Sequence, residues 1–376
     1  MFSVKLRAMK NIHLIITDLF LPEDFAAEVC AGLRLPALER LLARGVANSG
    51  RGNLATNRNE LGGKVVPATL EDLLCGVFGV SCRAGAPVAP IAAAFDGLGE
   101  GCWLCADPVH LRLQREQVVL LPNVEISANE ALVLCASLNA HFVGQGLEFF
   151  APHPQRWYVR LDELPEIQTV PLSQAAGRNI HGNLPTGAAE RRWHQLFNEI
   201  QMLLFAHPLN AAREERGELP VNSVWFWGSG DGRVGAQSTY ASVSSDEMLG
   251  EMLAASAGLP FLEWSPTWQS SFDSALTHGE RRLAAEGGQL LVWTGLRSAL
   301  QRGDLAAWRE ALQTFEANYA QPLWQALRGG KIASLQLDVL GGDGLRQTRL
   351  TRGSGWALWR RPKRLAEYSV ESRHTK

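Results

Sequence analysis

The sequence predicts an α/β fold in which a mostly parallel β-sheet carries helices on both faces. Two short apolar runs, residues 12–17 and residues 290–293, indicate buried strands, because strands of parallel sheets are near-continuous runs of Val, Ile and Leu. Apolar residues at helical spacing between Trp193 and Leu204 indicate an amphipathic helix. Strands that alternate with helices along the chain are typical of this fold class.

Length and composition limit the function classes. With 376 residues, the chain is long enough for one large core or for two domains. The hydrophobic fraction of 46% and the charged fraction of 20% are typical of globular proteins, and the formal net charge of −2 gives no sign of a polyanionic partner. No apolar run approaches the ~20 residues that span a bilayer, and the N-terminal run ends at Asp18 without a cleavage site. We therefore expect a cytoplasmic protein with no membrane partner.

The cysteines do not form a recognisable metal site. There are six of them: Cys30, Cys75, Cys82, Cys102, Cys105 and Cys135. Cys102 and Cys105 form a C-x-x-C motif, which serves redox chemistry or half of a zinc site in some proteins. No second C-x-x-C completes a four-thiolate site, and residues three apart on a strand point to opposite faces. We interpret Cys102 and Cys105 as structural cysteines.

The first predicted strand delivers Asp18 to its carboxyl end, which is the edge of an open α/β sheet where ligands bind. The alternative is that Asp18 caps a turn. Residues 35–45 predict a helix that begins at a proline and ends at a glycine, and residues 48–64 predict a long loop. Residues 65–80 then predict a turn and a helix.

The remaining elements follow from the same patterns. A glycine-rich link is predicted at residues 95–101, where we place a domain boundary. Strands or helices are predicted at residues 103–113, 129–142, 157–161, 193–204, 210–217, 221–227, 246–258, 290–293, 303–319, 322–327 and 335–339, with glycine-rich loops at residues 177–187 and 228–232.

A cluster of polar residues surrounds the end of the central amphipathic helix. Pro208 ends that helix, because proline clashes with the preceding helical turn. Asn210 suits the N-cap of a second short helix, and Gly217 suits its C-cap. Binding groups are often presented near such chain reversals, and the alternative is that these residues cap helices and fix turns. The candidates are His207, Asn210, Arg213 and Asn222.

The pattern H-P-x-N-x-x-R-x-x-x-G-x-x-P-x-N, from His207 to Asn222, resembles the matching segment of archaeal-type cofactor-independent phosphoglycerate mutases. Those enzymes belong to the alkaline-phosphatase-like metalloenzyme superfamily. The chain is also similar to RpfE-type regulatory proteins of bacteria. The resemblance implies an alkaline-phosphatase-like core at residues 1–101 and 223–365, an inserted smaller α/β domain at residues 102–222, and a tail at residues 366–376.

The resemblance also implies catalytic positions, and most of them are altered. It places a metal-binding aspartate at Asp18 and a strand ending in Asp-His where this chain has Asp338 without the histidine. The metal-binding segment D-E-A-G-H-x-G-D is replaced by residues 294–304, whose Arg297 and Arg302 would oppose a divalent ion. Two carboxylates cannot hold a catalytic pair of metals, which needs about six to eight ligands.

The phosphorylated serine of the mutases has no counterpart, and this chain has Ala68 and Thr69 there. Thr69 suits an N-cap, and the alternative is a nucleophile whose pKa a metal depresses. The resemblance makes Asp107 and Arg112 candidate ligand contacts, against the alternative of a turn aspartate and a surface arginine. Asp231 lies in the glycine-rich segment at residues 228–233, whose backbone N–H groups could cradle an anion.

We therefore expect a degenerate phosphoglycerate-mutase-like protein that serves as a regulatory or anionic-ligand-binding protein, takes a small phosphorylated or anionic ligand, and needs no cofactor. The alternative is an active phosphoglycerate mutase or phosphohydrolase with rewired ligands that uses Mn or Zn. Its candidate ligands would be His110, His141, His153, His181 and His207. A third hypothesis is nucleic-acid binding by the basic residues 344–365, where Trp356 and Trp359 occur, although a final strand pair with a solvated face is favoured. The oligomeric state stays open.

Overall fold

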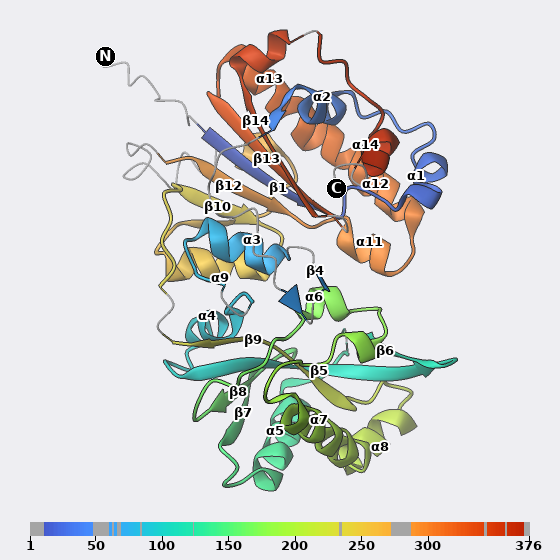
Figure 1. Cartoon of the computed structure of the whole chain (residues 1–376), viewed down its shortest axis with the longest axis vertical. Coiled ribbons are helices and arrows are strands. Elements are labelled where there is room, and N and C mark those ends of the chain that lie inside the picture. The colour runs from blue at the N-terminus through green and yellow to red at the C-terminus, as the bar shows by residue number, and fades with distance from the viewer. Residues whose placement is uncertain are drawn as a thin grey trace. The chain divides into compact units, whose positions relative to one another are not determined.

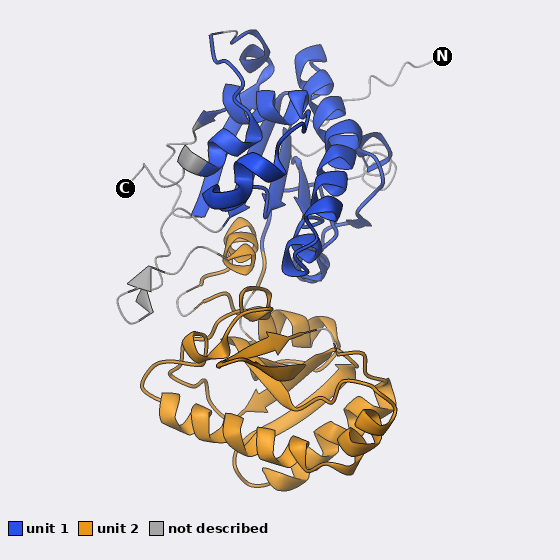
Figure 2. Ribbon diagram, turned by 90° about the vertical axis from the view of Figure 1, so that its right-hand side faces the viewer, with its two compact units in different colours: residues 1–56, 237–376 blue, residues 57–236 orange. Residues whose placement is uncertain are grey.

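The computed structural model describes residues 11–47, 60–61, 64–65, 69–82, 85–122, 124–232, 235–271, 287–341, 344–357 and 359–371. Two compact units divide the chain, and Figure 2 shows them in different colours. The first unit comprises residues 1–56 and 237–376, and the second comprises residues 57–236.

The first unit is built on a seven-stranded sheet with the order β11-β10-β12-β1-β13-β14-β2 (Figure 1). Five strands are parallel, namely β1 (Asn11–Thr17), β10 (Ser242–Ser245), β11 (Phe261–Glu263), β12 (Gln289–Trp293) and β13 (Ser334–Gly341). The edge strands β14 (Gly344–Thr351) and β2 (Val46–Ala47) are antiparallel. The predicted fold class, a mostly parallel sheet in an α/β protein, is confirmed.

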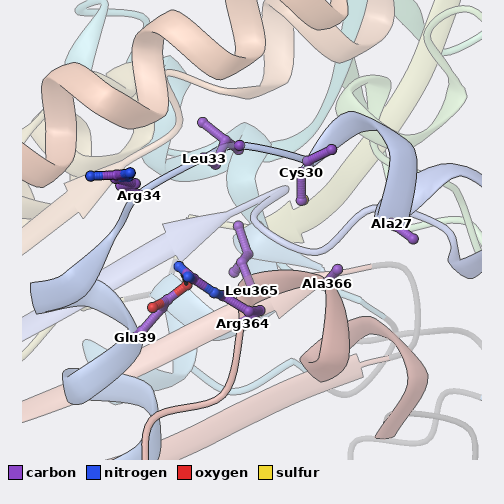
Figure 3. A pocket seen from close by; sticks show the side chains of 10 residues that line it. Ala27, Cys30, Leu33, Arg34, Glu39, Arg364, Leu365 and Ala366 are labelled. Carbon is purple, nitrogen blue, oxygen red and sulfur yellow. Dashed lines mark ion pairs between the residues drawn. The ribbon is translucent and has the colours of Figure 1, made fainter.

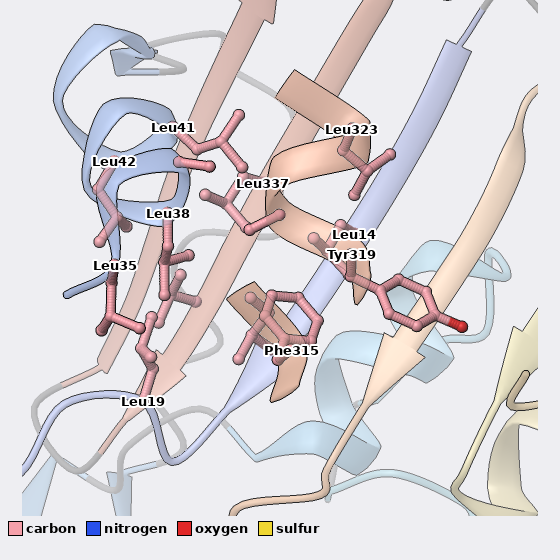
Figure 4. Close-up of a cluster of buried hydrophobic side chains, with 14 of the residues drawn as sticks. Leu14, Leu19, Leu35, Leu38, Leu41, Leu42, Phe315, Tyr319, Leu323 and Leu337 are labelled. Atoms are coloured by element: carbon pink, nitrogen blue, oxygen red, sulfur yellow. The ribbon is translucent and has the colours of Figure 1, made fainter. Parts of the chain in front are cut away.

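Helices cover both faces of this sheet. On one face, the main core packs β1 and β13 against α2 (Pro36–Arg44), α12 (Leu305–Phe315) and α13 (Gln321–Gly329), with α1 (Glu23–Val29) and α14 (Leu365–Glu371) nearby. Figure 4 shows Leu14 and Leu337 of the strands close to Leu38, Phe315 and Leu323 of the helices. On the other face, Gly250 of α9 (Met248–Ser256) approaches Val243 and Ser245 of β10 closely. The short α11 (Arg297–Gln301), η2 (Glu316–Ala320, a π-helical segment) and η3 (Arg352–Trp356) complete the unit.

The second unit is an antiparallel sheet with helices. Its strands are β5 (Cys102–Gln114), β6 (Gln117–Leu121), β7 (Leu147–His153), β8 (Arg156–Leu161) and β9 (Ser223–Asp231), and β5 pairs with β6, β8 and β9. The helices α5 (Ala128–His141) and α7 (Glu190–Phe205) bury their apolar faces on this sheet. The remaining elements are α3 (Leu70–Val77), α4 (Val88–Phe95), α6 (Leu172–Ala175), η1 (Ile180–Gly182), α8 (Pro208–Glu215) and the small pair β3 (Glu60–Leu61) and β4 (Lys64–Val65).

The unit boundaries differ from the expected domain boundaries at residues 101/102 and 222/223. Strand β9 pairs with β5 from Val109↔Ser223 to Cys102↔Asp231, so it belongs to the second unit. A Cβ atom on Gly230 would lie 2.7 Å from Cβ of Pro87, so the absent side chain lets the start of α4 pack directly on β9. These long-range contacts extend the second unit to residues 57–236.

Three local expectations need correction. Residues 228–231 belong to β9 and do not form the expected loop, because pairing with β5 extends the strand. The helix expected to begin at Asn210 begins at Pro208 with His207 as its N-cap, because proline is well suited to the first helical position. Residues 366–371 of the expected tail belong to α14, whose Leu365 and Tyr368 are buried in the core. The loop expected at residues 48–64 lies largely outside the described residues, as does Ala68.

Within the described ranges, none of the helices is both long and apolar enough to cross a membrane.

Candidate functional site

The carboxyl edge of the parallel sheet holds Asp18, as expected. Asp18 follows β1 in a left-handed backbone conformation with φ of 59°, which non-glycine residues adopt infrequently. Its backbone N–H donates to the carbonyl of Leu340 at 3.0 Å, and its carbonyl accepts from the indole N–H of Trp308 at 3.2 Å. The backbone of Asp18 is therefore anchored to β13 and to α12, and its carboxylate remains 35% exposed.

A single arginine joins Asp18 to a second carboxylate. Nε of Arg297 lies 3.4 Å from Oδ2 of Asp18, and Nη1 of Arg297 lies 3.4 Å from Oε2 of Glu247. Arg297 is the first residue of α11 after β12, and Glu247 follows β10, so three neighbouring strands each deliver one member. The adjacent Asp246 accepts the backbone N–H of Thr294 at 2.8 Å and 3.0 Å. The edge is thus an internally paired cluster.

This cluster does not fit a dimetal centre. Metals of the phosphatase type need several free carboxylate or imidazole ligands, whereas the carboxylates of Asp18 and Glu247 face a guanidinium that is permanently charged. Across the part of the chain that the structure describes, no group of three or more His, Cys, Asp or Glu side chains is arranged to hold a metal ion. We therefore derive no reaction step through a metal at this edge.

Asp338 lies away from Asp18. In the parallel pairing of β1 with β13, Asp338 aligns with Ile15 and Leu340 with Thr17. Asp338 is therefore three positions before the level of Asp18, or roughly 10 Å along the sheet at ~3.3 Å per residue. The structure does not bring the two predicted metal-ligand aspartates together.

Asp338 instead belongs to a buried polar chain that the sequence reasoning missed. Its Oδ2 lies 3.0 Å from Nε2 of His13 and accepts from Nε2 of Gln347 at 2.8 Å. Nδ1 of His13 lies 2.5 Å from the hydroxyl of Tyr240. Asp338 is 0% exposed and His13 is 4% exposed. A usable signal was present, since His13 interrupts the apolar run at residues 12–16 and Asp338 interrupts the apolar run at residues 337–340.

A cavity of about 230 Å³ opens beside these buried polar side chains, at the amino ends of the parallel strands. His13, Tyr240, Gln336 and Arg349 are among its lining residues. Arg349 is exposed and makes no ion pair with any residue that the structure describes. The lining of the cavity thus combines a positive charge with an imidazole and a phenol.

A larger cavity of about 410 Å³ lies beside α1, α2 and α14 (Figure 3). Nη1 of Arg364 lies 3.8 Å from Oε1 of Glu39, a buried carboxyl group whose pKa is raised by burial. The chain itself therefore supplies the cation that this carboxyl group attracts, and we assign no ligand to this cavity.

The residues of the family-like pattern are tied together within the second unit. Nδ1 of His207 accepts the N–H of Leu209 at 3.1 Å, its Nε2 lies 2.9 Å from the hydroxyl of Ser137, and burial lowers its pKa. The amide of buried Asn210 donates to the carbonyls of Leu204 at 2.7 Å and Val221 at 2.8 Å. These contacts are the ones expected if His207 and Asn210 fix the turns, which is the alternative to ligand binding.

Arg213 and Asn222 make contacts of the same kind. Arg213 is 1% exposed, and its guanidinium donates to the carbonyls of Leu219 and Glu125 and to Oε2 of Glu130 at 3.0 Å. The side-chain amide of Asn222 accepts the N–H of Leu111 at 2.7 Å and donates to its carbonyl at 2.9 Å, as a strand backbone would. The pattern from His207 to Asn222 thus fastens α8 and the start of β9 to their neighbours.

The other candidates are dispersed along β5 and β9. Asp107 is buried, accepts the indole N–H of Trp227 at 2.7 Å, and has its pKa raised to about 7 by burial. Arg112 is exposed five positions further along β5, roughly 17 Å away at ~3.4 Å per residue. Asp231 of β9 pairs with Cys102, which lies five positions before Asp107 on β5. The structure does not bring these three residues to one site.

Thr69 is the N-cap of α3 in a capping box. Its hydroxyl accepts the N–H of Asp72 at 2.9 Å, and the carboxylate of Asp72 accepts the N–H of Thr69 at 3.4 Å. This is the capping role weighed above. All six cysteines are free thiols, in keeping with structural cysteines, and burial raises the pKa of the Cys105 thiol well above its usual value.

Comparison with known proteins gives partial similarities. No protein-family model matches the sequence. The chain is 32% identical over 107 residues to the 2,3-bisphosphoglycerate-independent phosphoglycerate mutase of Methanosarcina barkeri, and 28% identical over 107 residues to that of Methanosarcina mazei. Each match covers 28% of this chain and 27% of the relative, so the chain spans about a quarter of the length of these curated relatives.

Solved structures are similar over most of the chain. The PH0037 protein from Pyrococcus horikoshii has a TM-score of 0.55 at 12% identity, with 96% of this chain and 92% of that chain covered. The cofactor-independent phosphoglycerate mutase from Thermoplasma acidophilum has a TM-score of 0.41 at 13% identity, with 92% of this chain and 90% of that chain covered. The chain therefore has an α/β fold similar to that of the PH0037 protein and a weak, partial homology to cofactor-independent phosphoglycerate mutases.

Proposed function

We propose that this chain is a degenerate phosphoglycerate-mutase-like protein that acts in the cytoplasm as a regulatory or anionic-ligand-binding protein and does not transfer phosphate. The observation that carries this proposal is the bridge from Asp18 to Glu247 through Arg297. The similarity of the chain to RpfE-type regulatory proteins favours the regulatory role. The missing serine and the altered segment at residues 294–304 support the loss of catalysis.

Electrostatics explain why the bridge opposes metal binding. Near a protein surface, two unit positive charges 4 Å apart repel each other by about 4 kcal/mol. A divalent metal ion at that distance from the guanidinium of Arg297 would be repelled by about twice as much. Arg297 would have to leave both carboxylates before such an ion could bind them. A metal site at this edge therefore requires the side chain of Arg297 to move away from both carboxylates.

The alternative, an active metal-dependent enzyme with rewired histidines, has less support. The candidate histidines have different neighbours: His110 contacts the carbonyl of Pro220, His141 lies near Glu199, and His207 contacts Ser137. None of these contacts joins one candidate histidine to another.

The cavity beside His13 is a suitable place for the anionic ligand. Arg349, which has no ion-pair partner among the described residues, supplies a positive charge there, and Tyr240 supplies a hydroxyl group. At about 230 Å³, the cavity suits a ligand smaller than a drug molecule, such as a phosphate or a short phosphorylated acid.

The decisive test measures metal content and activity together. Full-length protein, purified without chelators and then incubated with Mn²⁺ or Zn²⁺, is analysed for bound metal and assayed for conversion of 3-phosphoglycerate to 2-phosphoglycerate. We expect neither metal nor turnover. In Arg297→Met, the freed carboxylates should bind Mn²⁺ weakly, whereas the control Arg302→Met should not. Near-stoichiometric metal with turnover in the unaltered protein would overturn the proposal.

Ligand binding is tested separately by titration calorimetry with inorganic phosphate and 3-phosphoglycerate. We expect Arg349→Gln to weaken binding about tenfold, since a charged hydrogen bond contributes about 1.5–3 kcal/mol. The exposed Arg361→Gln is the matched control and should leave the affinity unchanged. Equal affinity in all three proteins would remove the cavity from the proposal.

A further inference from the structure

A third cavity, of about 370 Å³, lies at the carboxyl ends of two parallel strands of the first unit. Trp264 directly follows β11, Trp293 is the last residue of β12, and Gly295 follows in the next loop; all three line the cavity. The opposite wall comes from α12 and η2. Ligands of open α/β sheets bind outside the carboxyl ends of the strands, which is where this cavity lies.

The aromatic part of its lining consists of rings that stack on one another in nearly parallel planes. The rings of Trp264 and Tyr319 have centroids 4.3 Å apart and planes 16° apart, and those of Trp293 and Phe315 are 4.1 Å and 14° apart. The rings of Phe315 and Tyr319 differ by only 6° in plane. The hydroxyl of Tyr319 donates to the carbonyl of Ser265 at 2.6 Å, which holds this ring in place. Figure 4 shows Phe315 and Tyr319 side by side at the border of the core.

The helical wall supplies space and polar groups. Ala307 and Ala311, four residues apart on α12, line the cavity with small side chains. Glu310, Thr314 and Asn318 line it with polar groups. Asn318 and Tyr319 belong to the π-helical segment η2, and π-helical turns are frequent at functional sites. The helix is therefore irregular where it borders the cavity.

The charge of the lining is negative. Glu310 is the one charged residue among the described lining residues, and no Arg or Lys accompanies it. Glu310 is exposed and has no ion-pair partner within the described ranges, and the side-chain amide of Asn318 has no hydrogen-bond partner there. An aromatic ring has a negative face that attracts cations, and more strongly when the cation is desolvated. The partly exposed indole of Trp264 and the carboxylate of Glu310 therefore favour the same sign of charge.

We propose that this cavity binds a planar organic cation of about two fused rings. The indole of Trp264, the one ring of the four that is partly exposed, contacts the ligand, Glu310 balances its charge, and the side-chain amide of Asn318 hydrogen-bonds to its edge. A volume of about 370 Å³ lies at the lower end of small-molecule pockets, which start near ~300 Å³. This site is separate from the anion cavity beside His13 and does not depend on the proposed loss of catalysis.

The test compares three bicyclic probes of similar shape by titration calorimetry with full-length protein: N-methylquinolinium as the cation, quinoline as the neutral ring, and 2-naphthoate as the anion. We expect N-methylquinolinium to bind about fivefold more tightly than quinoline, because an exposed ion pair contributes up to ~1 kcal/mol. The anion should bind more weakly than both. Failure of every probe to bind, or preference for the anion, would overturn the proposal.

Two variants locate the site. Glu310→Gln should weaken N-methylquinolinium about fivefold and leave quinoline unchanged, and because Glu310 is exposed this variant should fold normally. Trp264→Ala should weaken both probes about tenfold, with a thermal melt to verify folding. The exposed Glu28→Gln and Trp356→Ala are the matched controls and should change neither affinity. Unchanged binding in Glu310→Gln and Trp264→Ala would show that the probes bind elsewhere.

Discussion

Nε2 of His13 lies 3.0 Å from Oδ2 of Asp338, although the two residues are 325 positions apart in the sequence and come from adjacent parallel strands. Both side chains are almost fully buried. The amides of Gln347 and Gln336 and the hydroxyl of Tyr240 provide their remaining contacts. Polar groups at such depth are retained only when they are paired, because an unpaired buried charge is costly.

Removing His13 should therefore destabilise the first unit strongly. In His13→Ala, the carboxylate of Asp338 retains only glutamine amides as partners, and we expect the free energy of unfolding to fall by about 3–5 kcal/mol. Urea unfolding measures the loss. The exposed His181→Ala is the control, and a loss below about 1 kcal/mol for His13→Ala would contradict a stabilising buried contact between His13 and Asp338.

Asp107 should make the folded protein less stable as pH rises, whereas most carboxylates of folded proteins have the opposite effect. Burial raises its pKa from 3.8 to about 7 in the folded state, so between these values the folded state holds a proton that the unfolded state has released. This carboxyl group therefore contributes less and less stability as pH rises from about 4 to about 7.

Asp107→Asn should remove that loss while keeping an acceptor oxygen for Trp227. We expect its stability relative to the unaltered protein to improve with pH, by up to roughly 4 kcal/mol above pH 7. Thermal melts at pH 5 and pH 8 measure the difference, with the half-exposed Asp231→Asn as control. A difference that does not change with pH would mean that Asp107 ionises normally.

Glu130 predicts acid lability in the second unit. Burial opposes its ionisation, but the N–H and hydroxyl of Ser127 and the guanidinium of Arg213 outweigh burial and lower its pKa from 4.5 to about 2. The stabilisation is therefore complete above about pH 4.5 and is lost as pH falls toward 2. The melting temperatures of the unaltered protein and Glu130→Gln should differ at pH 7 and converge near pH 2. A constant difference would contradict the shift.

Arg213 should not tolerate replacement by lysine. Its planar guanidinium contacts Leu219, Glu125 and Glu130 at once, and a lysine ammonium cannot reproduce that fork. We expect Arg213→Lys to lower the free energy of unfolding by about 2–4 kcal/mol, because buried acceptors lose their donors. The neighbouring Arg216→Lys, on a half-exposed side chain, should cost less than about 1 kcal/mol. Equal losses would argue against the buried fork.

The sequence by itself determined the local elements and the fold class. The first strand, expected at residues 12–17, is Asn11–Thr17, and the helix expected at residues 35–45 is Pro36–Arg44. Thr69 caps a helix as its neighbours predicted. These features depend on hydrophobic periodicity, prolines and caps, which act between residues close in the chain.

The tertiary structure alone decided which side chains meet. Pairing with β5 made residues 228–231 a strand and moved the unit boundary, and the register of β1 with β13 separated Asp338 from Asp18. Arg297 reaches Asp18 across 279 positions, and the aromatic cavity assembles residues 264–319. Such contacts depend on strand order, register and side-chain packing between segments far apart in the chain, and no local pattern of residues encodes them.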